Sequence, residues 1–314
     1  MDSGSEMSRG GKDEETGGKE ERRWEDLTKE ALVEVFTRVD FEDKYRNVAL
    51  VCKAWRRAVM EAACWVEVDI DSSFEKRKET AIWWTTEFET RMESMIMTVV
   101  DWGSSQLRRL RTRHCSDKAL QCIGQRCPNL RLLHIQMSQN VTNESMTRLA
   151  SICPKLESVD LSECRSVSAE TLSKLGEHCK GLTELKRNMR EIDGNCRMRS
   201  FGIPQRILQL VPMGDQEANV ISKCMPQLKR LEMRNSTIHD QCLLLLAENC
   251  TELEFLDLCG CSYLTGRGLD EAQQKLPPLI LFKKPILPER NLQFERYGHW
   301  QLFDNRFSHQ YLEF

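Results

Sequence analysis

The sequence predicts an α/β protein in which a small helical bundle is followed by a solenoid, with parallel strands on its concave side and helices on its convex side. Three observations lead to this prediction. The chain has 314 residues, of which 40% are hydrophobic and 30% charged, a balance typical of a soluble globular protein. Residues 24–68 carry apolar side chains at helical spacing. Residues 106–276 repeat one pattern about every 26 residues.

The composition argues against several other classes. Residues 1–23 contain five glycines and twelve charged residues, so we expect a disordered tail there. The longest apolar run, 242–247, has six residues, whereas a membrane span needs about 20. The net charge of −3 gives no reason to expect a nucleic acid or a membrane as partner. No apolar stretch of the secretory type opens the sequence, so the expected location is the nucleus and/or the cytoplasm, where thiols stay reduced.

Residues 24–68 are expected to form about three short helices, the first capped by Thr28. The apolar residues of this first helix fall at i, i+3, i+4 and i+7, on one helical face: Leu32, Val35, Phe36 and Val39. The second set continues the pattern: Val48, Val51, Cys52, Trp55 and Val59. Residues 69–105 are expected to form a helical bridge that caps the first repeat.

The repeat is marked by cysteines. Their spacing is 26 residues within each of two groups: Cys127, Cys153 and Cys179, then Cys224 and Cys250. A leucine and a strand-like apolar pattern follow each cysteine, and apolar residues precede it on one helical face. One strand–turn–helix unit cannot bury its own apolar face, but stacked units can, which predicts the solenoid. The cysteines are expected to fill tight corners of its core.

One unit departs from the period, because 45 residues separate Cys179 from Cys224. The departure begins at Arg187, in a position where the other strands are apolar. We expect an insert near 187–215 that projects as a basic loop and helps to choose a target with an acidic or phosphorylated segment. Residues 277–314 are expected to form a C-terminal cap, since solenoid ends must cover an open core.

Side chains that flank the middle apolar residue of each strand should point away from the core. They mix both signs of charge, which favours a surface that binds a protein. The candidate target-binding residues are Arg111, Arg113, His134, Gln136, Asp160, Lys186, Arg230, Glu232, Arg234, Phe255 and Asp257.

Several segments resemble a known family. The stretches WEDLTKEALVEVF at 24–36 and LVCKAW at 50–55 resemble an F-box, and the cysteine-containing units resemble the leucine-rich repeats of F-box proteins. Together with WWTTEFETRMESM, RHCSD and ERYGHWQLFDNRF, they are similar to plant F-box/leucine-rich-repeat proteins of the Skp-interacting type.

The resemblance implies a non-catalytic, substrate-recognition subunit of an SCF-type ubiquitin ligase, with no cofactor. Its F-box would dock a Skp-type adaptor and through it a cullin, and its repeats would hold an unknown target protein. By motif position, the resemblance implies that the adaptor-binding residues are Leu27, Leu32, Val35, Val51 and Trp55.

Two alternatives remain: a receptor for a hormone or another small molecule, and a repeat scaffold that acts without the ligase. An enzyme is not expected, because the sequence has no P-loop, GxSxG, HExxH or GxGxxG motif. No pair of cysteines has the C-x-x-C spacing of a zinc site, so no metal is expected.

Overall fold

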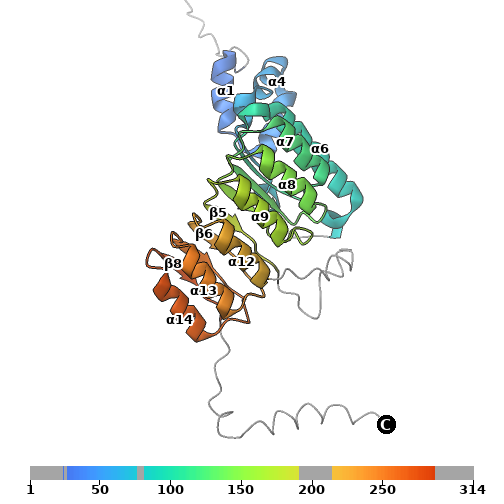
Figure 1. Ribbon diagram of the computed structural model, residues 1–314. Coiled ribbons are helices and arrows are strands. Elements are labelled where there is room, and N and C mark those ends of the chain that lie inside the picture. The colour runs from blue at the N-terminus through green and yellow to red at the C-terminus, as the bar shows by residue number, and fades with distance from the viewer. Residues whose placement is uncertain (1–23, 25–26, 76–80, 191–213, 287–314) are drawn as a thin grey trace, which may run out of the picture. The chain divides into compact units, whose positions relative to one another are not determined.

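The computed structural model describes residue 24 and residues 27–75, 81–190 and 214–286, in two compact units divided after Met60 (Figure 1). The expected tail, most of the expected insert and residues 287–314 of the expected cap lie outside the described residues. The first unit is helical, and its elements are α1 (Lys29–Thr37), α2 (Phe41–Asp43), the π-helical segment η2 (Lys44–Val48), α3 (Ala49–Val51) and α4 (Lys53–Val59).

Helix α1 begins where the sequence predicted. The Thr28 side chain accepts a hydrogen bond from Ala31 N at 3.3 Å and so satisfies one of the free N–H groups of the first turn. Leu32 and Phe36 are buried, as one face of an amphipathic helix should be. The Phe36 ring meets the Trp55 ring of α4 edge to face at 5.1 Å, which ties the two helices together.

The second unit contains one sheet of eight parallel strands in sequence order. Each strand pairs with the next, and the described strands are β1 (Glu67–Asp69), β2 (Arg109–Arg113), β3 (Leu132–Gln136), β4 (Ser158–Asp160), β5 (Glu184–Lys186), β6 (Arg230–Glu232), β7 (Phe255–Asp257) and β8 (Leu281–Lys283). This order confirms the solenoid prediction, because only repeats that follow one another in space give it.

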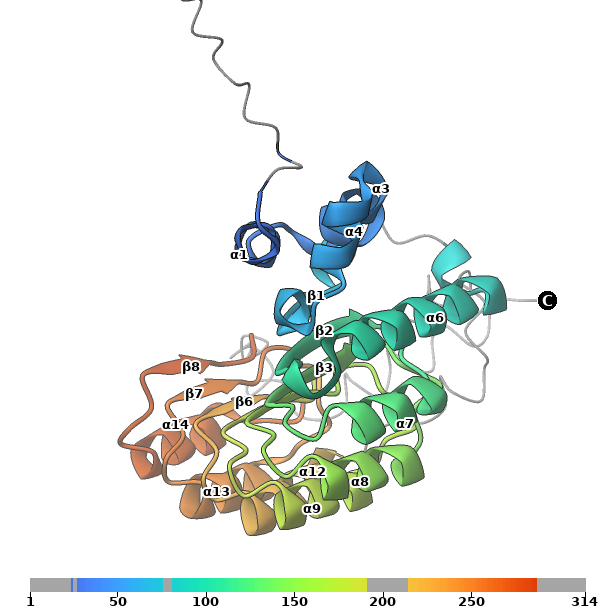
Figure 2. The same ribbon diagram turned by 90° about the horizontal axis from the view of Figure 1, so that it is seen from above.

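The helices described in this unit connect successive strands and cover one side of the sheet, and they leave the other side uncovered (Figure 2). They are α5 (Ser72–Glu75), α6 (Thr86–Gly103), α7 (Asp117–Arg126), α8 (Asn143–Ile152), α9 (Ala169–His178), α12 (Gly214–Cys224), α13 (Asp240–Asn249) and α14 (Gly266–Lys275). Short 3-10 helices complete the unit: η3 (Ala62–Trp65), η4 (Ala81–Trp84) and η5 (Ser104–Gln106).

The core runs through the whole unit as rows of side chains in register. The second residue of each strand from β1 to β7 is apolar and at most 2% exposed. In order, these residues are Val68, Leu110, Leu133, Val159, Leu185, Leu231 and Leu256. Each repeat therefore buries its apolar residues against both neighbours, as the repeat argument requires.

The repeat cysteines lie where the helices end. Cys127, Cys153, Cys179 and Cys250 follow the last helical residue and are 0% exposed. The Cys153 thiol donates to the Cys127 carbonyl oxygen at 3.5 Å, and the Cys179 thiol to that of Cys153 at 3.6 Å. A small side chain that carries a weak donor suits this corner, because it fills the space and also binds the preceding repeat.

Cys224 does not take the equivalent position, contrary to the prediction. It is the last residue of α12 and only half-buried, and Met225 follows it at the helix end with 0% exposure. Met225 N donates to Ile221 O, and Met225 O accepts from Leu228 N, the same bonds that Cys250 makes with Leu246 and Leu253. The 26-residue distance between Cys224 and Cys250 is therefore one residue out of phase with the structural repeat.

The sheet extends further than the expected repeat boundaries of 106 and 276. Strand β1 begins at Glu67, inside the expected F-box segment, and α6 of the expected bridge is the helix between β1 and β2. Strand β8 lies in the expected cap. Just before the cap, Leu276 takes the position at the end of α14 that a cysteine takes in the other repeats. The first and last units lack the cysteine, so the spacing of cysteines could not identify them.

Arg187 does not break the repeat, which corrects the interpretation of this residue. It lies two residues after Leu185, in the row that holds Ile135, Leu161, Met233 and Leu258 elsewhere, and is 1% exposed. Its guanidinium donates to the carbonyl oxygens of Leu161, Cys164 and Val167 at 2.6–2.9 Å, and its Nε donates to Glu217 Oε1 of α12 at 3.0 Å. Burial raises the pKa of Glu217, an effect that the charge of Arg187 opposes.

The chain leaves the repeat pattern slightly later, at Met189. The fourth residue after the second residue of each strand from β2 to β7 has a left-handed backbone, with φ between 52° and 77°, except Met189. These residues are His114, Met137, Glu163, Asn235 and Gly260. Residues 187–190, which were expected in the insert, therefore belong to the packed unit.

Substitution of Arg187 by leucine should lower the free energy of unfolding by about 3–5 kcal/mol, because it leaves the Glu217 carboxylate buried without its cation. Chemical denaturation measures this loss. Arg131→Leu is a matched control, since Arg131 forms an exposed ion pair with Glu157 at 3.2 Å that should contribute less than about 1 kcal/mol. If Arg187→Leu does not fold, Glu217→Gln gives a milder test. Losses no larger than that of the control would contradict a buried pair that holds the repeats together.

Cys153 and Cys179 should react slowly with a thiol reagent in the folded protein. Burial raises the pKa of the Cys153 thiol to about 12 and that of Cys179 to about 11, so neither forms the reactive thiolate near neutral pH. The half-buried Cys122 on α7 should be labelled faster than either of them. Cys153→Ser should cost roughly 1–3 kcal/mol of stability, because a hydroxyl is less readily desolvated than a thiol. Equal labelling rates at Cys122 and Cys153 would show that the corner opens readily.

Candidate functional site

The first unit exposes more apolar surface than its size requires. Six large apolar side chains are 38–82% exposed: Trp24, Leu27, Val35, Leu50, Val51 and Met60. Leu50 and Val51 belong to α3, which ends just before α4. Single exposed apolar residues are ordinary, but several on a small helical unit indicate a surface that a partner covers.

Three of the five predicted adaptor-binding residues belong to this exposed set, namely Leu27, Val35 and Val51. Leu32 does not, because it is 1% exposed and forms the core between the helices. Trp55 is half-buried against Phe36, so most of its ring serves the core as well. The sequence analysis missed Leu50, at 82% exposed the most accessible of the set, although its position next to Val51 was a usable signal.

All eleven predicted target-binding residues lie on the side of the sheet that the helices leave uncovered. Strand register aligns six of them in one row, which we call the polar row. With the end strands included, the polar row consists of Asp69, Arg111, His134, Asp160, Lys186, Glu232, Asp257 and Lys283. Four of the remaining five lie beside it on the same strands, and Arg234 lies two residues after the end of β6; the other four are Arg113, Gln136, Arg230 and Phe255.

This surface is not simply solvated, since the middle of the polar row is buried by its neighbours. His134, Asp160 and Glu232 are 3–6% exposed and Asp257 is 0% exposed. Glu232 pairs with Arg230 at 2.7 Å and with Lys186 at 3.6 Å, and Asp257 pairs with Arg234 at 2.6 Å. The Arg230 guanidinium also lies 3.6 Å from the centre of the Phe255 ring.

The pKa values of two aspartates in the polar row are shifted in opposite directions. Burial raises the pKa of Asp160 to about 6, although hydrogen bonds from Ser162 and the charge of Lys186 work against it. Burial also acts on Asp257, but a backbone hydrogen bond from Cys259 and the Arg234 guanidinium outweigh it and lower the pKa of that carboxyl. Burial lowers the pKa of His134 to about 4, so this ring is neutral near pH 7.

A cavity of about 300 Å³ opens on this surface, at the ends of β2 to β6. Five of the predicted target-binding residues line it: Arg113, Gln136, Asp160, Lys186 and Glu232. The others are Met137, Ser162, Glu163, Asn188, Met189 and Arg190, which come from the turns after the strands. The sequence analysis missed this second set, because turn residues fall outside the alternating pattern that it followed.

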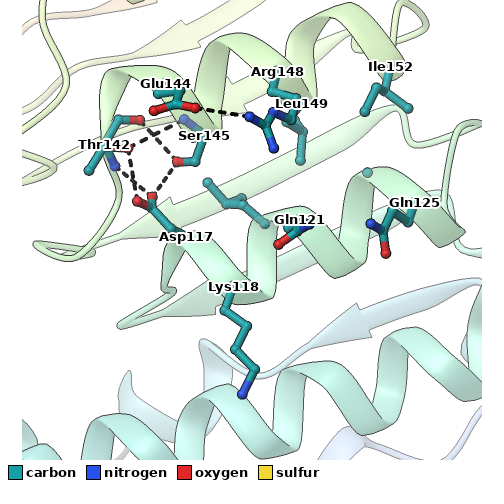
Figure 3. A pocket seen from close by; sticks show the side chains of 12 residues that line it. Asp117, Lys118, Gln121, Gln125, Thr142, Glu144, Ser145, Arg148, Leu149 and Ile152 are labelled. Atoms are coloured by element: carbon teal, nitrogen blue, oxygen red, sulfur yellow. Dashed lines mark hydrogen bonds and ion pairs between the residues drawn. The ribbon is translucent and has the colours of Figure 1, made fainter.

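A second cavity, of about 430 Å³, lies between α7 and α8 on the helical side of the sheet (Figure 3). Asp117 points from α7 toward the start of α8 and accepts hydrogen bonds from Thr142 N and Thr142 Oγ1 at 2.8 and 2.9 Å. Asp240 at the start of α13 accepts the equivalent hydrogen bonds from Thr265, the residue before α14. This polar lining therefore connects consecutive repeats.

Two kinds of feature are absent from residue 24 and residues 27–75, 81–190 and 214–286. Within these ranges, no three or more histidine, cysteine or acidic side chains are grouped to hold a metal ion. None of the described helices is both long and apolar enough to cross a membrane.

The chain is similar to several known proteins. The family model for the F-box domain matches residues 24–67. The chain is 36% identical over 293 residues to F-box protein SKIP1 of Arabidopsis thaliana, which covers 91% of this chain and 96% of that protein. It is 40% identical over 263 residues to putative F-box/LRR-repeat protein 19 of the same plant, covering 83% and 87%. Among solved structures, the yeast Rad7 and Elc1 complex aligns with 64% of this chain and 56% of that chain, at 16% identity and a TM-score of 0.38.

The relatives span almost the whole chain, and the F-box match covers the helical unit whose apolar side chains are exposed. The sheet of parallel strands that follows has the architecture of leucine-rich repeats. The chain therefore belongs to the plant F-box/leucine-rich-repeat proteins.

Proposed function

We propose that this protein is the substrate-recognition subunit of an SCF-type ubiquitin ligase and has no catalytic activity of its own. Its F-box docks a Skp-type adaptor and through it a cullin, and the open side of its sheet binds a target protein for ubiquitination. The proposed location is the nucleus and/or the cytoplasm. The observation that carries the proposal is the coincidence of the F-box match with the exposed apolar side chains of residues 24–60.

The adaptor surface is proposed to centre on Leu50 and Val51. Leu27 and Val35, which are also exposed, are proposed to contribute to it. Leu50 is 82% and Val51 58% exposed, so a partner that covers them gains most of their transfer free energy, about 1.5–3 kcal/mol for a fully buried side chain. Leu32 and Trp55 are proposed to support this surface from below, since both pack within the unit.

The open side of the sheet favours a protein target over a hormone. Its cavity, about 300 Å³, is at the lower limit of small-molecule sites, which are mostly lined by apolar and aromatic side chains. Here most of the lining residues are charged or carry amides and hydroxyls. Charged groups spread over several strands suit an extended segment of protein.

The double variant Leu50→Ala/Val51→Ala should lose adaptor affinity by at least roughly 10-fold, because it removes apolar area that only a partner buries. Co-purification with a recombinant Skp-type adaptor, followed by calorimetry, measures this loss. The thermal midpoint should stay within a degree or two, since neither side chain lies in the core.

Ile82→Ala and Tyr263→Ala are matched controls, because they remove exposed apolar side chains from the second unit, at 66% and 55% exposure. Both should keep full adaptor affinity. A double variant that still binds the adaptor like the wild type would contradict the proposed surface. A wild-type protein that captures neither adaptor nor cullin would favour a scaffold that acts without the ligase.

A further inference from the structure

Asp160 is a buried carboxylate that lines the cavity on the open side of the sheet. It is 3% exposed, and its hydrogen bonds come from the backbone and side chain of Ser162, both neutral. Among the described residues, no basic side chain forms an ion pair with it. A buried charge without a partner is costly, so its presence in a cavity calls for an explanation.

The other two acids of the cavity have cations. Glu163 pairs with Arg165 at 3.3 Å, and both side chains are buried. Glu232 pairs with Arg230 and Lys186. Of the three acids that line the cavity, Asp160 is therefore the one that forms no ion pair with a described residue, although the charge of Lys186 acts on it from further away.

The basic residues of the cavity are directed elsewhere. Lys186 lies beside Asp160 in the polar row, but its ammonium pairs with Glu184 at 3.5 Å and with Glu232 at 3.6 Å. Arg113 pairs with Asp71 of the first repeat. The Arg190 guanidinium lies 3.3 Å from the Met137 sulfur.

The repeat itself supplies a comparison, because Asp257 occupies the same position in the polar row three strands later. Asp257 accepts a hydrogen bond from the residue two positions on, Cys259 N at 3.1 Å, just as Asp160 accepts one from Ser162 N at 2.9 Å. Asp257 has in addition the Arg234 guanidinium, from the preceding strand, at 2.6 Å. The residue equivalent to Arg234 in the repeat before Asp160 is Gln136, whose amide donates to Asp71 at 3.3 Å.

We propose that the cavity receives a basic side chain of the target protein, arginine or lysine, whose charge pairs with Asp160 in the place that Arg234 takes at Asp257. Met137 and Met189 line the same cavity, and their flexible apolar side chains suit the aliphatic part of such a residue. This inference rests on the proposed function, since it names the kind of target segment that the sheet binds.

The experiment uses the full-length protein and surface-bound peptides of glycine and serine, each with one central arginine, lysine, glutamine or glutamate. The wild type should bind the arginine and lysine peptides at least roughly 10-fold more than the glutamine peptide, because the buried carboxylate gains a charge-assisted hydrogen bond. Asp160→Asn should abolish this preference, and its thermal midpoint at pH 7.5 should rise, which shows that the variant is folded.

Gln136→Arg is the second variant, since it supplies in the chain the cation that Asp257 already has. It should also abolish the preference and raise the thermal midpoint. Gln121→Arg on α7 makes the same change of charge on the helical side of the sheet and should bind the peptides like the wild type. A preference for the glutamate peptide would overturn the proposal and show that the arginines dominate the cavity. Equal binding by the wild type and Asp160→Asn would overturn it as well.

Adaptor binding is measured on the same preparations, so that the two proposals fail separately. Loss of the arginine preference with full adaptor binding would contradict only the cavity assignment. Retained preference in a protein that binds no adaptor would contradict only the ligase role.

Discussion

No repeat of this protein can close its own core, and the rest of the structure follows from that constraint. The second residue of each strand from β1 to β7 is apolar and buried against the neighbouring strands, in one row from Val68 to Leu256. The same dependence between repeats recurs in polar contacts. Asp117 accepts a hydrogen bond from Thr142 N at the start of the next repeat's helix, and the Cys153 thiol donates to the carbonyl oxygen of Cys127 in the preceding repeat. Arg187 extends it across the interruption between β5 and β6, where it joins the turn after β4 to Glu217.

The sequence predicted the repeat well wherever a cysteine marks it. Spacing alone identified the units that end at Cys127, Cys153 and Cys179, because in these units a buried thiol fills the corner at the helix end. It failed where a different residue fills that corner, at Met225 and Leu276, and this shifted one unit and hid the last one. The buried role of Arg187 could not be predicted, since its partner lies 30 residues further along the chain.

The candidate site shows a similar division. Alternation along the strands predicted that all the candidate target-binding residues share one side of the sheet, and they do, because side-chain direction in a strand depends only on parity. Burial within that surface depends on the long side chains of neighbouring strands, so the 0% exposure of Asp257 required the structure. In the F-box, helical spacing grouped Leu32 with Val35, but only packing decides that the first is core and the second exposed.

The two surfaces differ in physical chemistry, and this bears on how one chain can bind two partners. Apolar side chains such as Leu50 offer area to bury, which is a non-directional attraction. On the sheet, most charges already have partners, so a charged target group that displaces one of them loses about as much as it gains. A net gain therefore needs a position where the repeat leaves a buried charge without its cation. At Asp257 the repeat provides Arg234, and at Asp160 it provides Gln136 instead, so specificity on this surface depends on a missing arginine more than on the charges that are present.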